Sequence, residues 1–218
     1  MMKLVIYDLD GTLINSRQDI ADAVNWTLNH LGLGRLSSKR IASFVGMGVR
    51  HLITTTLKEA SGGKRPALPV EDVIQMYRGR YAEHLVDKTR LYPFVRQVLE
   101  RLKNRKQAVM TNKPEDSSRE ILKRLGVAPY FFRVIGGGGR FPKKPSPTAL
   151  LHLMRAARAR AEETLFVGDS AIDVRTARNA GVRMAAVTYG FANRREITAA
   201  GPDFILNNFA ELIECMSK

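Results

Sequence analysis

Six short apolar runs recur along the chain and predict the strands of a sheet. Most of them lack a strict alternation of apolar and polar residues, which is typical of strands that are covered on both faces. Segments with helical periodicity lie between the runs, and strands that alternate with helices predict a parallel sheet with right-handed crossovers. The predicted strands are Lys3–Tyr7, Gln107–Met110, Arg133–Ile135, Thr164–Val167, Met184–Thr188 and Phe204–Leu206.

Helix boundaries are marked by small and capping residues. Gly126 and Gly181 each follow a helical pattern and are predicted to end it, because glycine readily adopts the left-handed conformation found after a helix. Ser146 is a candidate N-cap, and Pro147 is predicted to be the first residue of the helix that follows.

Residues 16–88 interrupt this alternation. They contain helical patterns and no convincing strand, and a loop is predicted at residues 61–69. We therefore expect an α/β core built from residues 1–15 and 89–218, with a helical insertion between its two parts.

Polar residues follow several predicted strands at the point where each strand ends. Ligands of parallel α/β sheets bind beyond the carboxyl ends of the strands, so these residues are candidates for a site by position. The candidates are Asp8 and Asp10 after the first strand, Thr111 and Asn112 after the second, and Asp169 and Asp173 after the fourth.

One such residue is most simply explained as a turn former or a cap. Four acids at neighbouring strand ends need compensating charge, however, and a metal with oxygen ligands supplies it. Carboxylates that leave room for water suit Mg²⁺. Lys143 and Lys144, in a proline-stiffened loop, could balance an anionic ligand, and the Thr111 hydroxyl could bind a phosphate. This combination of groups is suited to phosphoryl transfer.

The formal net charge of +14 leaves three explanations open: a nucleic-acid partner, attraction of small anionic substrates, or a basic solvated surface. The basic residues are scattered, and no aromatic residues interleave with them as in single-strand binders. A solvated surface that attracts anions is therefore favoured over nucleic-acid binding.

Cys215 is the only cysteine, which rules out a disulfide within the chain and agrees with a reducing compartment. No apolar run is long enough to span a bilayer, and the first residues lack the features of a signal peptide. We expect a cytoplasmic protein without a membrane partner. The sequence makes no prediction of the oligomeric state.

Four segments, in this order and spacing, resemble the motifs of the haloacid dehalogenase superfamily: DLDGTL, TN, KKPSP and GDSAIDVRTARNAG. The insertion resembles the helical cap of that superfamily. Its segment FVGMGVRHLI and the stretch FVGDSAIDVRTARNAGVRMAAVTYGF are similar to phosphoglycolate-phosphatase-like members. The resemblance covers essentially the whole chain and implies a Rossmann-like core with an inserted α-helical cap.

The resemblance also implies a Mg²⁺-dependent phosphatase that works through an aspartyl-phosphate. Asp8 would be the nucleophile, and Asp10 would protonate the leaving oxygen and then activate water. Thr111 and Asn112 would hold the phosphate, and Lys144 would neutralise charge. The metal would be ligated by Asp8, Asp169 and the backbone carbonyl of Asp10. Asp173 would act through water or by orienting its neighbours. Gly11 would allow the backbone to approach the site closely.

The expected substrate is a small phosphorylated metabolite such as phosphoglycolate, with nucleoside monophosphates, pyrophosphate and sugar phosphates as alternatives. Gly46, Gly48 and Arg50 of the cap are candidate substrate contacts. The alternatives are an ordinary turn for the two glycines and, for Arg50, a position in solvent, which is favoured for that residue. Two departures from the pattern of many relatives bear on the substrate: Gly138 and Gly139 stand where those relatives have acids, and Phe94 stands where they have glycine.

Overall fold

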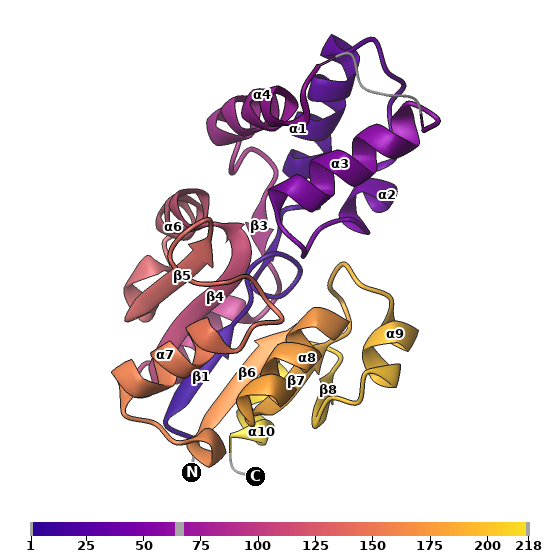
Figure 1. The fold of residues 1–218 in the computed structure, drawn as a ribbon. Coiled ribbons are helices and arrows are strands. Elements are labelled where there is room, and N and C mark those ends of the chain that lie inside the picture. Colours follow the sequence, from indigo (N-terminus) through magenta and orange to yellow (C-terminus); the bar gives the residue numbers. More distant parts are fainter. Residues whose placement is uncertain (1, 64–67, 217–218) are drawn as a thin grey trace.

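The core of the protein is a six-stranded parallel sheet in the order β5-β4-β1-β6-β7-β8. The structure, a computed structural model, describes residues 2–63 and 68–216. All six predicted strands are present, with β1 between β4 and β6 (Figure 1). The strands are β1 (Leu4–Tyr7), β4 (Lys106–Pro114), β5 (Arg133–Gly137), β6 (Thr164–Gly168), β7 (Arg183–Val187) and β8 (Phe204–Leu206).

Both faces of the sheet are buried, as the unbroken apolar runs predict. Along β1, Val5 and Tyr7 belong to one hydrophobic cluster, and Leu4 and Ile6 belong to another. Residues of α5, α6 and α10 belong to the first cluster, which also extends into the helices of residues 17–83, and residues of α7, α8 and α9 belong to the second. These helices are α5 (Val95–Arg101), α6 (Glu115–Arg124), α7 (Thr148–Ala157), α8 (Ala171–Ala180), α9 (Arg194–Ala199) and α10 (Leu212–Cys215).

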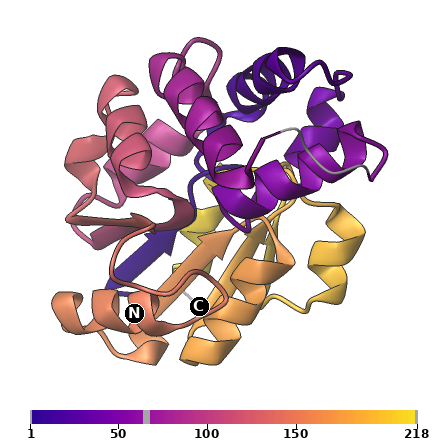
Figure 2. The same ribbon diagram turned by 45° about the horizontal axis from the view of Figure 1, so that its top comes forward.

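Four further helices form a separate layer beyond the carboxyl ends of the strands (Figures 1 and 2). We call this layer, with its connecting segments, the cap. Helix α1 packs against α2 and α4, and α3 packs against α4. Within the described part of the chain, no helix combines the length and the apolar character needed to cross a bilayer. The cap helices are α1 (Arg17–His30), α2 (Ser38–Ala42), α3 (Val49–Ala60) and α4 (Val70–Glu83).

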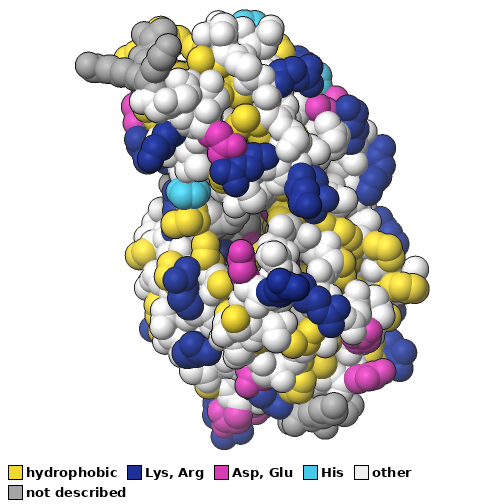
Figure 3. All heavy atoms as spheres, turned by 90° about the vertical axis from the view of Figure 1, so that its right-hand side faces the viewer, with side chains coloured by type: hydrophobic (Ala, Val, Ile, Leu, Met, Phe, Trp, Pro, Cys, Tyr) yellow, Lys and Arg dark blue, Asp and Glu magenta, His cyan; other side chains and the backbone are white. Residues whose placement is uncertain are grey.

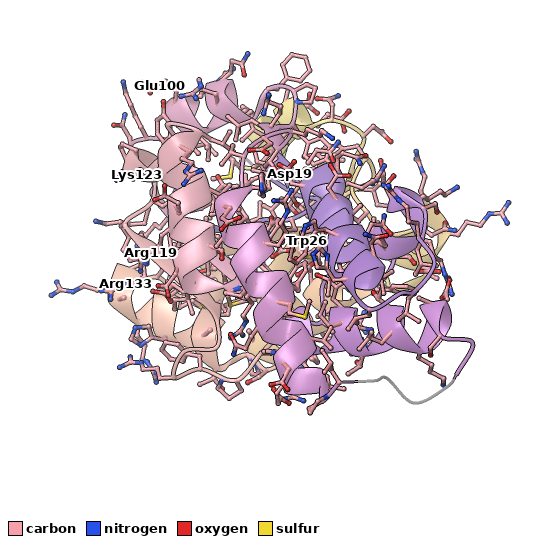
Figure 4. The ribbon with its side chains drawn as sticks, turned by 90° about the horizontal axis from the view of Figure 1, so that it is seen from above. Asp19, Trp26, Glu100, Arg119, Lys123 and Arg133 are labelled. Atoms are coloured by element: carbon pink, nitrogen blue, oxygen red, sulfur yellow. The ribbon has the colours of Figure 1, made fainter. Side chains whose placement is uncertain are left out.

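The two chain segments that join the cap to the core run side by side. Strand β2 (Ile14–Asn15) leaves the core and pairs antiparallel with β3 (Arg90–Leu91), which returns to it. Asp19, labelled on α1 in Figure 4, fastens this junction. Its buried carboxylate accepts hydrogen bonds from the backbone N–H groups of Lys88 and Thr89 and from the Thr89 hydroxyl, at 2.7–3.0 Å.

Two predicted helix ends are confirmed, and one predicted helix start is shifted. Gly126 and Gly181 both follow their helices with positive φ, as predicted. The predicted start of α7 is wrong by one residue, because Thr148 is the first helical residue and Pro147 takes the N-cap position. The Ser146 hydroxyl interacts with the Thr148 hydroxyl at 2.9 Å and does not act as the N-cap. Residues 64–67 of the predicted loop lie outside the described residues.

Candidate active site

The sheet order brings the polar strand ends to one place. Because β1 lies between β4 and β6, Asp8 and Asp10 emerge between the segment that carries Thr111 and the one that leads to Asp169. These residues line a cavity of about 1480 Å³ between the sheet and the cap. Asn112 and Lys144 line it as well.

Three carboxylates gather at one end of this cavity, where Asp8 and Asp169 line it and Asp173 lies behind them. Asp8, Asp169 and Asp173 are buried, and each offers an oxygen within 4.8 Å of the others. Within the described part of the chain, Lys144 supplies the only ammonium at ion-pair distance from them, 2.8 Å from Asp8 Oδ1 and 2.6 Å from Asp173 Oδ1. One ammonium does not balance three carboxylates, so this all-oxygen cluster suits a divalent cation.

The pKa values reflect this imbalance of charge. Burial raises the pKa of Asp8 to about 6, even though the charge of Lys144 lowers it. Burial, followed by the charges of Asp173 and Asp8, raises the pKa of Asp169 well above its ordinary value. Burial lowers the pKa of the Lys144 ammonium, but the charges of Asp173 and Asp8 outweigh that effect and raise it. The cluster therefore lacks positive charge as it stands.

Asp173 is held by the helix on which it lies. Its Oδ2 accepts hydrogen bonds from the Ser170 backbone N–H at 3.1 Å and from the Ser170 hydroxyl at 2.6 Å, which forms a capping box at the start of α8. Its Oδ1 accepts the hydrogen bond from Lys144. Asp173 thus orients Lys144 toward Asp8 and lies behind the cavity wall.

One oxygen of the Asp169 carboxylate accepts a backbone hydrogen bond and also lies close to Gly11. The Phe191 N–H donates to Asp169 Oδ2 at 2.7 Å. Gly11 has a φ of +84°, and a Cβ at that position would lie 2.1 Å from the same oxygen. Only glycine allows this approach, which accounts for the glycine of the DLDGTL motif.

Asp10 does not point freely into the cavity. Its Oδ1 accepts a hydrogen bond of 2.5 Å from the Ser16 hydroxyl, and Lys113 Nζ lies 3.1 Å from both carboxylate oxygens. Lys113 also donates to the hydroxyl of Tyr81 on α4 at 2.7 Å. Sequence analysis missed Lys113 and Tyr81.

A signal for one of these two residues was present in the sequence. Lys113 directly follows Thr111 and Asn112, so it is a charged residue at the end of a strand whose preceding residues are buried. Tyr81 lies four residues after Tyr77 on the buried stripe of α4, a spacing that is equally typical of ordinary core aromatics. Only the three-dimensional structure brings Tyr81 to the site.

Thr111 and Asn112 differ in how many hydrogen bonds their side chains make, because the Thr111 hydroxyl accepts one, from the Lys113 backbone N–H at 3.3 Å, whereas Asn112 uses both ends of its amide. Both are largely buried and both line the cavity. The Asn112 amide donates to the Gly46 carbonyl at 2.8 Å, and its oxygen accepts from the Lys144 N–H at 2.8 Å. Asn112 therefore joins a loop of the cap to the segment that carries Lys144.

The cap residues expected from sequence fall into two groups. Gly46 and Gly48 line the cavity, and Lys143 Nζ lies directly against Gly48. Arg50 is paired with Glu71, its side chain is 60% exposed, and it is not among the described residues that line the cavity.

Comparisons with known proteins agree with this geometry. Residues 5–187 match the model of the haloacid dehalogenase-like hydrolase family. The chain is 35% identical to a phosphoglycolate phosphatase of Vibrio parahaemolyticus over 99% of this chain and 96% of the relative. It is 34% identical to a phosphoglycolate phosphatase of Aquifex aeolicus over 99% of this chain and 97% of the relative.

A solved structure is similar over the same extent. The crystal structure of a protein described as a predicted phosphoglycolate phosphatase from Haemophilus somnus superimposes with a TM-score of 0.93 at 31% identity. The match covers 98% of this chain and 97% of the other. The sequence match, the sheet order and the acidic cluster beneath a helical cap lead to one conclusion: this chain belongs to the haloacid dehalogenase-like hydrolase family.

Proposed function

We propose that the protein is a Mg²⁺-dependent phosphatase that hydrolyses a small phosphate monoester through an aspartyl-phosphate on Asp8. The observation that carries the proposal is the environment of Asp8. It is buried between the ammonium of Lys144 and two further carboxylates, and Asp10 follows two residues later. A carboxylate nucleophile divides one difficult displacement into two easier ones.

The acidic cluster would hold the metal. Asp8, Asp169 and the backbone carbonyl of Asp10 would be ligands, with Asp173 acting through water or through Lys144. When bound, Mg²⁺ supplies positive charge that offsets the charge of the phosphoryl group and of the carboxylates.

The reaction has two steps for the residues of this chain. In the first, an Asp8 oxygen bonds to phosphorus, the ester P–O bond breaks, and Asp10 gives a proton to the leaving oxygen. The Thr111 hydroxyl and the Lys144 ammonium hold the phosphoryl group, Asn112 keeps the Lys144 segment in place, and the backbone at Gly11 lies close to the reacting atoms. In the second step, water releases phosphate and restores the Asp8 carboxylate.

Arg17 supports a substrate with a second anionic group. It lines the cavity at the start of α1, with its guanidinium 5.2 Å from the Phe191 ring and 3.4 Å from the Gly190 carbonyl. Its Nε is buried and has no hydrogen-bond partner among the described residues. An unpaired buried donor is costly, and a carboxylate on the substrate would satisfy it. Together with the names of the two relatives, this favours phosphoglycolate over the other phosphate esters.

We assign residues 16–88 to the cap and residues 1–15 and 89–218 to the core. The β2–β3 pair and the hydrogen bonds of Asp19 lie at this boundary. Gly46 and Gly48 belong to the loop that faces the bound substrate. The cap covers the site and shields the aspartyl-phosphate until its water is positioned.

The assay that tests this proposal is steady-state turnover with Mg²⁺ on phosphoglycolate, a nucleoside monophosphate, pyrophosphate and a sugar phosphate. We expect the highest kcat/KM on phosphoglycolate and no measurable turnover in Asp8→Asn. We also expect Arg17→Met to raise KM for phosphoglycolate but not for p-nitrophenyl phosphate, which lacks a second anionic group. Absence of turnover on every ester, or full turnover in Asp8→Asn, would refute the proposal.

The arrangement of the basic side chains in the described part of the chain does not favour nucleic-acid binding. On the face shown in Figure 3, the basic side chains are dispersed among uncharged and acidic ones over both cap and core. The charge of +14 fits attraction of a small anion to the cavity. The cytoplasmic location stays a prediction.

A further inference from the structure

A buried row of polar groups connects the cap to Asp10. The row runs from the Tyr81 hydroxyl through Lys113 Nζ and the Asp10 carboxylate to the Ser16 hydroxyl. The Lys113 side chain is only 5% exposed. Its ammonium also lies 4.6 Å from the centre of the Tyr81 ring.

The members of this row come from different parts of the fold. Asp10 follows β1, Lys113 lies in β4 of the core, and Tyr81 lies on α4 of the cap. Tyr81 is itself buried and stacks on Tyr77 of the same helix, with ring centres 5.6 Å apart. The Lys113–Tyr81 hydrogen bond therefore joins core and cap at the carboxylate that handles protons in the proposed mechanism.

We propose that Lys113 is a positioning residue that fixes the orientation of Asp10 for the hydrolysis of the aspartyl-phosphate, and that Tyr81 makes this orientation depend on a seated cap. The proposal rests on the function proposed above. It adds two residues that act through Asp10 and do not touch the reacting atoms.

The hydrogen bonds distinguish the two oxygens of Asp10. Oδ1 accepts from both Ser16 and Lys113, whereas Oδ2 accepts only from Lys113 among the described residues. Oδ2 therefore keeps acceptor capacity for a water molecule. A carboxylate held by three hydrogen bonds is fixed in rotation, which is what a general base needs in order to face its water.

The step that depends on this orientation is the second one. The water oxygen bonds to phosphorus, and the bond between phosphorus and the Asp8 oxygen breaks. The electron pair of that bond returns to Asp8 as its carboxylate, and the water proton moves to Asp10 Oδ2. Inorganic phosphate is the product.

Hydrolysis of p-nitrophenyl phosphate isolates this step. Its leaving group departs without a proton, so kcat/KM reports the attack of Asp8 and is insensitive to Asp10. In Lys113→Met we expect kcat to fall by at least about 30-fold with kcat/KM within about 3-fold of wild type, in keeping with typical acid–base contributions. Because kcat/KM is unchanged, KM falls in proportion to kcat. Rapid mixing of the variant with p-nitrophenyl phosphate should then release a burst of one p-nitrophenolate per enzyme before steady-state turnover.

Two further single variants, each a smaller change than Lys113→Met, test the same row of groups. Tyr81→Phe removes only the hydroxyl of the cap and should produce the same pattern with a smaller loss of kcat. Lys113→Arg keeps a cation and should retain more activity than Lys113→Met. Tyr130→Phe is the matched control, because the Tyr130 hydroxyl contacts Glu100 and neither residue lines the cavity.

A purely structural role predicts another pattern. Loosening of the site would lower kcat/KM and kcat together and would give no burst, and that result in Lys113→Met and Tyr81→Phe would overturn the inference. Wild-type kcat in both variants would overturn it as well. If Lys113→Met fails to fold, the kinetics of Tyr81→Phe decide by the same criteria. Absence of wild-type turnover on any ester would instead refute the phosphatase proposal and this inference with it.

Discussion

Gly11 lies so close to Asp169 that a methyl group on Gly11 would fall 2.1 Å from Asp169 Oδ2. The glycine also has a φ of +84°, which side-chain-bearing residues rarely adopt. The loop that carries Asp8 and Asp10 and the segment that contains Asp169 are thus joined by a contact that leaves no space for a side chain.

Gly11→Ala is therefore expected to displace Asp169 and to lower turnover by at least about 100-fold, since small misplacements of reacting groups cost that much. Steady-state assays on p-nitrophenyl phosphate would measure the loss. Gly79→Ala is the matched control, because Gly79 lies in α4 with nothing within 4 Å of an added Cβ. It should keep wild-type turnover and gain about 0.5–1 kcal/mol of stability from its helical position. Equal turnover in the two variants would contradict the role given to Gly11.

Divalent cation binding should stabilise the folded protein, because three buried carboxylates share one ammonium. At a Mg²⁺ concentration about 100 times Kd, the free energy of unfolding should rise by about 2.7 kcal/mol. Thermal melting with Mg²⁺ and with EDTA would show the increase. Asp169→Asn should lose it, whereas Asp72→Asn, an exposed site in the first turn of α4, should retain it. A melting temperature that does not respond to Mg²⁺ in the wild type would count against the metal site.

Phe94 holds a backbone conformation that favours glycine. It has a φ of +67° and precedes α5 with 48% of its surface exposed. The left-handed conformation costs a non-glycine residue about 1–2 kcal/mol. Phe94→Gly should accordingly be about 1 kcal/mol more stable than Phe94→Ala, a comparison in which the aromatic ring is lost from both variants. Urea unfolding of the two proteins measures the difference, and equal midpoints would refute the prediction.

Glu163 should make stability depend on acidity. Its hydrogen bonds with Lys3 and with the backbone of Arg160 lower its pKa from an ordinary value near 4.5 to about 2. Because the pKa is depressed in the folded state, the stabilisation is present above about pH 4.5 and is lost as the pH falls toward 2. Unfolding of wild type and Glu163→Gln at several pH values should therefore show the largest difference near neutrality and little at pH 2. A difference that does not change with pH would contradict this account.

Much of the fold follows from local patterns. The six core strands are apolar runs, and their burial on both faces is already visible in the lack of alternation. Gly126 and Gly181 end helices because of a backbone preference that needs no tertiary contact. The β2–β3 pair could not be predicted, because two residues per strand carry no periodicity and their pairing depends on where the chain returns from the cap.

The site residues likewise divide into those that local sequence predicts and those that only tertiary contacts bring together. Asp8, Asp169 and Lys144 can be predicted because each lies in a motif beside a predicted strand or helix. The ion pair between Asp10 and Lys113 depends on the register of β1 against β4. The hydrogen bond from Lys113 to Tyr81 depends on the position of the cap relative to the core. Arg50 shows that position in the sequence alone does not place a residue in the site. It lies close in sequence to Gly46 and Gly48, but its side chain pairs with Glu71 on the surface.

The most direct measurement tests the covalent intermediate that we propose on Asp8. Wild-type protein would be mixed with p-nitrophenyl phosphate and Mg²⁺, quenched in acid and analysed by peptide mass spectrometry. The account predicts one phosphoryl group on the peptide that contains Asp8, and neither phosphoryl group nor turnover in Asp8→Asn. A phosphoryl group on another residue, or undiminished turnover in Asp8→Asn, would contradict it.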